Sequence, residues 1–352
     1  MKALFRVNAG ARIGLGHLQR CLSLAAALRQ LGTASLVLTD QEPSALERIR
    51  RFGFPGLARR ANGSWGEEDA RDTIDCARAH QCDILVVDSD EKGAAYLQRL
   101  REAGLFVCAI DDTAPHPFPC QLVVNGDAHA RRLAYRSSSG DTRFLLGPEY
   151  AILREEFWAL PPRVAPQDGR RLLIALGGAD PVNLMPRILD VVGRWLEPVT
   201  VTAIVGPFMT NLAETRAAAR RVAHPVRLVQ APESVAGLMQ EADVAISAGG
   251  QTLYELARVG CPTVAVRIAA NQDGQLQAFQ EAGFLRLAGR AEDPGIASAL
   301  GEAARRLLAD SPAREAMGEI GRRMVDGQGA RRVADGLLQH ARVSCTEAPV
   351  SR

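Results

Sequence analysis

The stretch FRVNAGARIGLGHLQRCLSLA (5–25) runs from a short apolar segment through a glycine-rich turn into an amphipathic segment. In the amphipathic part, Leu18, Leu22, Ala25 and Leu28 recur at helical spacing and form one apolar stripe. A strand, a glycine-rich turn and a helix in this order are the repeating unit of doubly wound α/β domains. The stretch therefore predicts a parallel sheet covered by helices.

The same alternation continues through both halves of the chain. Continuous apolar runs bounded by polar turns are typical of strands buried on both faces of a parallel sheet. They cover residues 3–7, 35–39, 84–88, 105–110 and 121–125 in the first half, and 172–176, 201–205, 226–230, 243–247, 263–267 and 284–288 in the second. Helical patterns cover 17–31, 181–195, 209–222, 234–241, 251–259, 272–282, 295–309, 312–324 and 329–341.

This rhythm predicts an α/β fold of two Rossmann-like, doubly wound domains that face each other across a cleft. Residues 1–160 form the expected N-terminal domain, and residues 170–325 form the C-terminal one. Between them PPRVAPQDG (161–169), with three prolines and one glycine, is the expected linker. Residues 326–352 are expected to be a terminal helix and a polar tail. Open parallel sheets bind ligands at the carboxyl ends of their strands.

The composition is that of an ordinary globular protein. The 352 residues include 42 basic and 40 acidic side chains, a net charge of +2, which argues against a general nucleic-acid binder. Seven cysteines form no CxxC pair, so we expect reduced thiols in a cytoplasmic protein. The sequence has no apolar run of about 18 residues, so no membrane insertion is expected. The first residues resemble a strand rather than a signal peptide.

Gly14, Gly16 and His17 lie where the first predicted strand leads into a helix. The glycines let the backbone approach a ligand, and a helix N-terminus presents free N–H groups and a positive dipole end. This dipole disfavours a second positive charge, so we expect His17 to stay neutral and to accept a proton. A plain glycine-rich turn with an incidental exposed histidine is the alternative.

A second strand–turn–helix unit is SAGGQTLYELARVGCPTVAV (247–266). Gly249 and Gly250 precede a helix whose N-terminus could bind an anion. The carboxylate of Glu255, about one turn into the helix, could accept hydrogen bonds from both hydroxyls of a ribose. Thr252 and Glu255 also have the T-x-x-E spacing of a capping box, which is the structural alternative.

Glycines also follow the first strand of the second half, in LGGADPVNL (176–184). Asp180 and Pro181 there fit the N-cap and the first position of a helix. Capping explains these two residues, but it leaves the pair Gly177 and Gly178 unexplained.

Asn271 and Gln272, in AANQDGQLQAF (269–279), offer amides to a polar ligand, although Asn271 could instead cap the next helix. Several polar turns at strand ends together favour a phosphorylated ligand held by backbone N–H groups. No P-loop motif occurs, and Gln19 stands where a GxGxxG fingerprint needs its last glycine.

Four carboxylates follow two central strands of the first half: Asp88, Asp90, Asp111 and Asp112. Carboxylates at strand ends contact sugars or metals, or they cap the next helix, and the sequence leaves both interpretations open. The basic run at 128–136 is interpreted as solvated surface.

Five motifs in this order carry a family resemblance: residues 5–25, YAILREEF (150–157), LGGADPVNL, SAGGQTLYELA, and Asn-Gln at 271–272. Up to about residue 285 the chain resembles the UDP-sugar hydrolases of pseudaminic acid biosynthesis. These enzymes remove UDP from UDP-2,4-diacetamido-2,4,6-trideoxy-β-L-altropyranose. The family is related to the MurG-like glycosyltransferases and has the two-domain GT-B fold.

The resemblance implies a role for each matching position. His17 matches the histidine that activates water for an inverting attack on the anomeric carbon. Glu255 matches the ribose-binding glutamate, and the turn before it matches the nucleotide-binding turn. The substrate-binding set expected on this basis is Asn8, Gly14, Gly16, Arg154, Gly177, Gly178, Ser247, Gly249, Gly250, Gln251, Thr252, Glu255, Asn271 and Gln272. Neither a metal ion nor a cofactor is expected.

The chain departs from the family at two strand ends. Asn8 stands where the family usually has aspartate, and Asp88-Ser89-Asp90 replaces a turn that usually holds His-Tyr after its aspartate. These two differences leave open which sugar is the substrate, and they are compatible with a related activity on another UDP-sugar. We expect a cytoplasmic hydrolase of a UDP-activated acetamido-deoxy sugar. An inverting GT-B glycosyltransferase with the same donor is the first alternative, and an inactive UDP-sugar sensor is the second.

Overall fold

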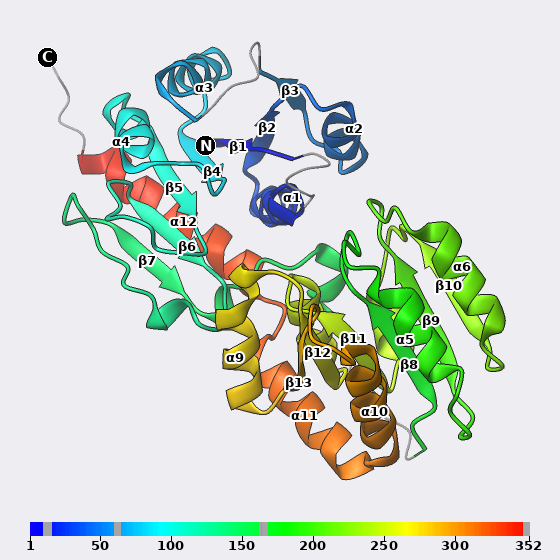
Figure 1. Ribbon diagram of the computed structural model, residues 1–352. Helices are drawn as coiled ribbons and strands as arrows, with labels where there is room; N and C mark the ends of the chain where they lie inside the picture. Colours follow the sequence, from blue (N-terminus) through cyan, green and yellow to red (C-terminus); the bar gives the residue numbers. More distant parts are fainter. Residues whose placement is uncertain (10–15, 60–64, 162, 164–167, 348–352) are drawn as a thin grey trace, which may run out of the picture. The chain divides into compact units, whose positions relative to one another are not determined.

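A computed structural model describes residues 1–9, 16–59, 65–161, 163 and 168–347, with side chains up to residue 343 (Figure 1). The chain divides into two compact units. Unit 1 comprises Met1–Glu155 and Gly327–Arg352, and unit 2 comprises Glu156–Asp326. Residues 156–160, expected with the N-terminal domain, thus group with unit 2. The C-terminal helix groups with unit 1.

Unit 1 is built on a sheet of seven parallel strands. The strands are β1 (Lys2–Val7), β2 (Ala34–Thr39), β3 (Gly56–Ala58), β4 (Ile84–Asp88), β5 (Phe106–Ile110), β6 (Leu122–Asn125) and β7 (Arg143–Leu146). Their order is β3-β2-β1-β4-β5-β6-β7, and every pair is parallel. The order reverses direction between β1 and β4, and such a switch point is where open α/β sheets bind ligands.

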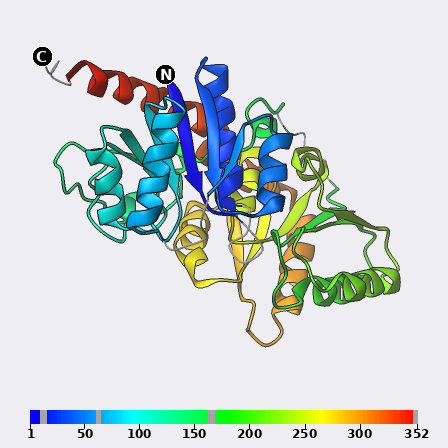
Figure 2. The same ribbon diagram turned by 90° about the horizontal axis from the view of Figure 1, so that it is seen from above.

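Helices cover both faces of this sheet. They are α1 (Gly16–Gln30), α2 (Pro43–Arg51), α3 (Glu67–Ala79), α4 (Ala94–Glu102) and α12 (Gly329–Glu347). The unit also contains the short 3₁₀ turns η1 (Ala130–Arg132) and η2 (Pro148–Tyr150), and η3 (Glu155–Phe157) lies where the chain passes from unit 1 to unit 2. Helix α12, red in Figures 1 and 2, lies against α1, β5 and β6. On the other face, Leu4 and Leu85 of the sheet form a core with Ile74 of α3 and Leu97 of α4.

Unit 2 repeats the architecture with six parallel strands. They are β8 (Arg171–Ala175), β9 (Thr200–Val205), β10 (Val226–Gln230), β11 (Val244–Ala248), β12 (Thr263–Arg267) and β13 (Leu285–Arg290), in the order β10-β9-β8-β11-β12-β13. The helices are α5 (Leu184–Val192), α6 (Leu212–Arg221), α7 (Ala236–Glu241), α8 (Thr252–Val259), η4 (Ala270–Gln272), α9 (Asp273–Ala282), α10 (Ile296–Ala309) and α11 (Ser311–Met324). Its switch point lies between β8 and β11.

The predicted fold class is confirmed: both units are parallel α/β sheets with flanking helices. All eleven predicted strands are present, with ends that differ by a few residues. Strands β3 and β7 were not predicted. β3 has only three residues and β7 is a half-exposed edge strand, so neither carries a buried apolar run. Among the described residues, no helix is long and apolar enough to cross a membrane.

Candidate active site

The switch point of unit 1 brings His17 to the end of β4. Strands β1 and β4 pair in register, with Val7 beside Asp88, so the two strands end side by side. Asp88 is the last residue of β4, and His17 is the second residue of α1. Residues that are 71 positions apart in the sequence therefore meet at one edge of the sheet.

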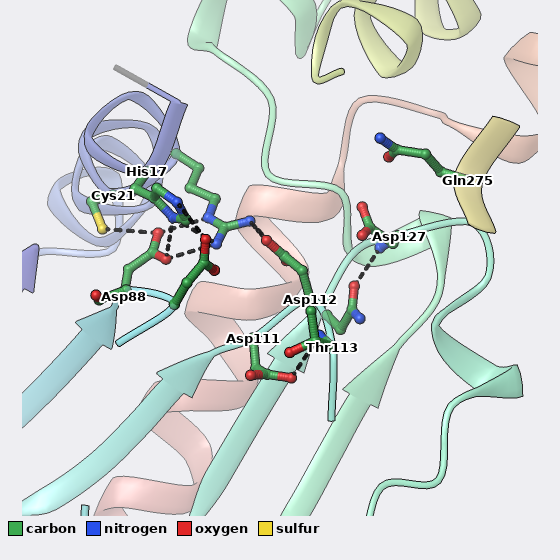
Figure 3. A network of polar contacts seen from close by, with 12 residues as sticks. His17, Cys21, Asp88, Asp111, Asp112, Thr113, Asp127 and Gln275 are labelled. Carbon is green, nitrogen blue, oxygen red and sulfur yellow. Dashed lines mark hydrogen bonds and ion pairs between the residues drawn. The ribbon is translucent and has the colours of Figure 1, made fainter. Parts of the chain in front are cut away.

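His17 is held between two carboxylates (Figure 3). Its Nδ1 lies 2.8 Å from Oδ1 of Asp88, which is fully buried. Its Nε2 lies 3.7 Å from Oδ2 of Asp90, whose side chain is largely exposed. The His17 side chain is 17% exposed, so the ring is anchored on its Nδ1 side and still reaches solvent.

Arg20, one turn further along α1, joins the same cluster. Its Nε donates to Oδ2 of Asp88 (2.6 Å) and its Nη2 to Oδ1 of Asp88 (2.7 Å). Its Nη1 lies 2.8 Å from both carboxylate oxygens of Asp112, the second residue after β5. Nη2 also approaches Nδ1 of His17 at 3.0 Å. One guanidinium thus ties α1 to the ends of two central strands.

The prediction of a neutral His17 is wrong for this arrangement. The negative charge of Asp88 raises the pKa of His17 to about 9, against the opposing effects of burial and of Arg20. Burial raises the pKa of Asp88, but the charges of Arg20 and His17 outweigh it, and the net pKa is lowered. The His17 imidazole is therefore protonated at neutral pH, with Nδ1–H donating to Asp88.

Asp111 and Asp112 are neighbours with different surroundings. Oδ1 of Asp111 accepts hydrogen bonds from the backbone N–H groups of Thr113 (3.0 Å) and Ala114 (2.7 Å). It also accepts one from the hydroxyl of Tyr135 (2.8 Å), and Lys92 Nζ lies 3.4 Å from Oδ2. Asp111 thus holds a turn together, whereas Asp112 extends to Arg20.

Asn8 belongs to a different network. Its Oδ1 accepts a hydrogen bond from Nη1 of Arg6 (2.7 Å), and Arg6 is fully buried against Asp69. Alternate residues of a strand point to opposite faces, so Asn8 shares the face of Arg6, whereas the register partner of Asp88 is Val7. The structure therefore does not bring Asn8 into the cluster of His17.

In unit 2, two of the predicted glycine turns flank the switch point. Gly177 and Gly178 follow β8 and are exposed, and Gly177 has a positive φ of 95°. Gly249 and Gly250 follow β11. A Cβ on Gly249 would lie 2.8 Å from the side chains of Gln272 and Leu276, so only glycine fits there. β8 and β11 are neighbouring parallel strands, which places both turns at one edge of the sheet.

Helix α8 begins at Thr252, and its N-cap is Gln251, which makes no side-chain capping hydrogen bond. The capping box from Thr252 to Glu255 needs Thr252 as the N-cap, so this alternative is not realised. Glu255 is 6% exposed in the first turn of α8. Ser247 is fully buried in β11, and its Oγ lies within hydrogen-bond distance of the carbonyl oxygens of Ala175 (3.0 Å) and Ala248 (3.1 Å).

The remaining predicted residues lie in several places. Asn271 is exposed within η4, and the N-cap of α9 is Gln272, not Asn271. Oε1 of Gln272 accepts hydrogen bonds from the backbone N–H groups at 268 (2.9 Å) and 269 (3.3 Å). Gly16 is the exposed first residue of α1, and Arg154 is half-buried just before η3. Gly14 lies outside the described residues.

The N-cap of α5 is Asn183, so the predicted N-cap position of Asp180 is wrong, although the Asp180 side chain does hold the start of the helix. Its two carboxylate oxygens accept from the backbone N–H groups of Leu184 and Met185, both at 2.8 Å, at the start of α5. The helix begins at Leu184, so Pro181 precedes it by three residues and is not its first position.

Sequence reasoning left out Arg20, and it considered Asp88 and Asp112 without including them in the site. One signal for Arg20 was present in the sequence, because residues three apart on a helix face the same side, as His17 and Arg20 do.

Among the described residues, no group of three or more His, Cys, Asp or Glu side chains could hold a metal ion.

The two sheets and their helices have the GT-B architecture of several solved structures. Acinetobacter baumannii MurG superposes with a TM-score of 0.70 at 15% identity, over 96% of this chain and 100% of that one. The S. aureus MnaA–UDP complex superposes with a TM-score of 0.65 at 14% identity, over 100% and 99% of the two chains. The class is thus defined at the level of the fold: a GT-B protein.

Sequence comparison confirms the predicted resemblance. The chain is 25% identical over 293 residues to the UDP-2,4-diacetamido-2,4,6-trideoxy-β-L-altropyranose hydrolase of Campylobacter jejuni, which is 81% of this chain and 98% of the relative. It is 29% identical over 199 residues to the spore coat polysaccharide biosynthesis protein SpsG of Bacillus subtilis, and 23% identical over 274 residues to an uncharacterised protein of Methanocaldococcus jannaschii.

These alignments cover 55% of this chain for SpsG and 75% for the Methanocaldococcus protein. They span only 58% and 55% of the length of the two relatives, respectively. No family model matches the chain.

Proposed function

We propose that this protein hydrolyses a UDP-activated acetamido-deoxy sugar to the free sugar and UDP. The observation that carries the proposal is the contact of His17 with buried Asp88 at the switch point of unit 1. The similarity to the Campylobacter hydrolase, which extends over nearly all of that relative, supports the same reaction class. The GT-B fold of MurG and of a UDP-bound relative supports a nucleotide-sugar ligand.

In this proposal, His17 is the general base. Asp88 accepts a hydrogen bond from Nδ1–H and thereby fixes the orientation of the ring. Nε2 is therefore the nitrogen that takes a proton from water. The water oxygen bonds to the anomeric carbon while the bond from that carbon to the phosphate oxygen breaks. The electron pair leaves with UDP, and the proton stays on Nε2. Asp88 then stabilises the imidazolium that has formed.

The nucleotide is assigned to the carboxyl-end turns of unit 2. Backbone N–H groups of Gly250 to Thr252 at the start of α8 are suited to phosphate oxygens, because a helix N-terminus attracts anions. Glu255 is the proposed partner of the ribose hydroxyls. Gly177 and Gly178 leave room for a close approach by the ligand, and Ser247 supports the Gly249 turn from within β11. Asn271 and Gln272 are assigned to the sugar-phosphate end.

An acceptor-free assay tests the proposal. Purified protein is incubated with a panel of UDP-activated acetamido-deoxy sugars in buffer, and free sugar and UDP are quantified. We expect free sugar from at least one substrate. The variant His17→Ala should lose on the order of 10²–10⁴ in rate, which is the contribution typical of a positioned general base. Turnover of His17→Ala at the wild-type rate would refute the role of His17.

The inverting GT-B glycosyltransferase is the second candidate, and the similarity to MurG favours it. It uses the same donor but transfers the sugar to an acceptor other than water. UDP release only after an acceptor is added would replace the hydrolase proposal with this one. UDP binding with no turnover in either assay would favour the UDP-sugar sensor.

A further inference from the structure

Arg20 makes its hydrogen bonds to two carboxylates inside the cluster. The guanidinium makes a fork with Asp88, with Nε on Oδ2 (2.6 Å) and Nη2 on Oδ1 (2.7 Å), and Nη1 takes both oxygens of Asp112 (2.8 Å). The Arg20 side chain is only 16% exposed. Such a planar, two-sided arrangement is specific to arginine, because a lysine ammonium cannot make two parallel bonds to one carboxylate.

The orientation of the Asp88 carboxylate depends on this fork. Its backbone is fixed in the middle of the sheet, and its side chain retains rotation about the bond to the carboxylate. Apart from Arg20, the Asp88 carboxylate has two hydrogen-bond partners. Nδ1 of His17 contacts Oδ1, and the Cys21 thiol, a weak donor, lies 3.6 Å from Oδ2. The Arg20 fork is thus the strongest restraint that keeps Oδ1 directed at His17.

Arg20 is held in turn by Asp112, which comes from another element. Asp112 lies two residues beyond β5, and its side chain is 28% exposed. An arginine on a helix surface would otherwise be free to rotate toward water. The chain of contacts runs from Asp112 through Arg20 and Asp88 to His17. Figure 3 labels Asp112, Asp88 and His17 in this network.

We infer that Arg20 is a positioning residue of the proposed hydrolase: held by Asp112, it orients the Asp88 carboxylate toward Nδ1 of His17. The inference rests on the proposed function for its kinetic consequence only. The orientation itself is a property of unit 1 and can be measured without substrate. A purely structural alternative exists, in which Arg20 only neutralises the buried charge of Asp88.

Arg20→Lys separates the two roles, because it keeps the positive charge and removes the fork. Among the described residues, the groups that face His17 are Asp88, Asp90 and Arg20, and Cys21, Lys92 and Asp112 interact with these three. In Arg20→Lys all other charges are unchanged. We expect the pKa of His17, followed by NMR of the free protein, to fall by at least one unit, because the bond from Nδ1 to Asp88 loosens.

The matched control is Arg101→Lys in α4. Arg101 makes the same kind of fork, with Nη1 and Nη2 on the two oxygens of Asp141 (2.9 and 2.6 Å), and neither residue contacts His17. This variant should leave the pKa of His17 within 0.3 unit of wild type. An equally unchanged pKa in folded Arg20→Lys would overturn the inference, whether or not the protein is a hydrolase.

The kinetic readout uses the substrate found in the acceptor-free assay. Measured above pH 9, where His17 is largely deprotonated in both proteins, Arg20→Lys should lower kcat at least tenfold with KM within twofold, because the base is misoriented while substrate contacts remain. If Arg20→Lys does not fold, Asp112→Asn replaces it. We expect Asp112→Asn to lower kcat about three- to tenfold at unchanged KM, and a wild-type kcat there would refute the inference. Absence of turnover in the wild-type protein would count against the proposed function and leave the NMR result to decide the role of Arg20.

Discussion

At His17, two electrostatic influences oppose each other. The N-terminus of α1 carries about half a positive charge, which disfavours an imidazolium. Asp88 carries a full negative charge 2.8 Å from Nδ1 in a buried setting, and its effect on the His17 pKa outweighs those of burial and of Arg20. Because the pKa of His17 is raised to about 9, the imidazole of the free protein is protonated at neutral pH.

The raised pKa of His17 predicts how the rate of catalysis depends on pH. A general base works only when deprotonated, so kcat/KM of the wild-type protein should rise with pH and level off above about 9. Asp88→Asn removes the charge that raises the pKa, so the midpoint should move down toward the ordinary value of about 6.5 while the maximal rate falls. The measurement is a pH–rate profile of both proteins.

Asp141→Asn, which removes a carboxylate paired with Arg101 elsewhere in unit 1, is the control and should keep the wild-type midpoint. A profile that falls with rising pH near 9 would contradict the base assignment. It would mean that His17 acts as an acid, protonating the departing phosphate.

At the scale of elements, the turn before α8 leaves no room for a side chain at Gly249. A methyl group on Gly249 would lie 2.8 Å from the side chains of both Gln272, in η4, and Leu276, in α9. We predict that Gly249→Ala displaces the turn and weakens UDP binding by at least tenfold in calorimetric titration.

Gly237 in α7 is the matched control for Gly249. It has no atom within 4 Å of an added Cβ, so Gly237→Ala should bind UDP as the wild-type protein does. Equal affinities for the two variants would show that the Gly249 turn does not hold the nucleotide.

The contact of α1 with the end of β4 also links stability to pH. The raised pKa of His17 favours the folded state fully below about pH 6.5, and this contribution is lost as pH rises through about 9. The lowered pKa of Asp88 acts in the opposite direction, stabilising above about pH 3.9 and losing its effect as pH falls. A shift from 6.5 to about 9 corresponds to at most roughly 3 to 4 kcal/mol.

Unit 1 should therefore lose stability between pH 6.5 and 9.5, and His17→Gln should remove most of this dependence. Trp65 is the tryptophan of unit 1, whereas Trp158 and Trp195 lie in unit 2. Urea unfolding followed by Trp65 fluorescence, with the other two tryptophans replaced by phenylalanine, measures the effect. An equal pH dependence in both proteins would assign it to other groups.

At the scale of the whole molecule, the positions of most strands and the fold class follow from the sequence because buried parallel strands are continuous apolar runs. The same rule fails for β3 and β7, which are short or half-exposed. The site is less predictable for a geometric reason. Asp88 and Asp112 lie 71 and 95 positions from His17 (88 − 17 and 112 − 17), and only the register of β1, β4 and β5 brings them together.

The glycine turns of unit 2, in contrast, can be predicted from the local sequence. Gly177, Gly178, Gly249 and Gly250 could be identified from the sequence because a glycine pair after a strand has a local signature. The interpretation of Asn8 as a substrate ligand came from the family resemblance, which matches it to a position at a strand end. Its side chain is committed to Arg6 on the face opposite Asp88, which a strand-end position alone does not reveal.

The central claim is that water activated by His17 attacks the anomeric carbon. The most direct measurement is turnover of the UDP-sugar in ¹⁸O-labelled water without acceptor, with mass spectrometry of both products. If this attack occurs, the free sugar carries one labelled oxygen, UDP is unlabelled, and His17→Ala does not form the labelled sugar. Label in UDP would mean attack at phosphorus and would refute the role of His17.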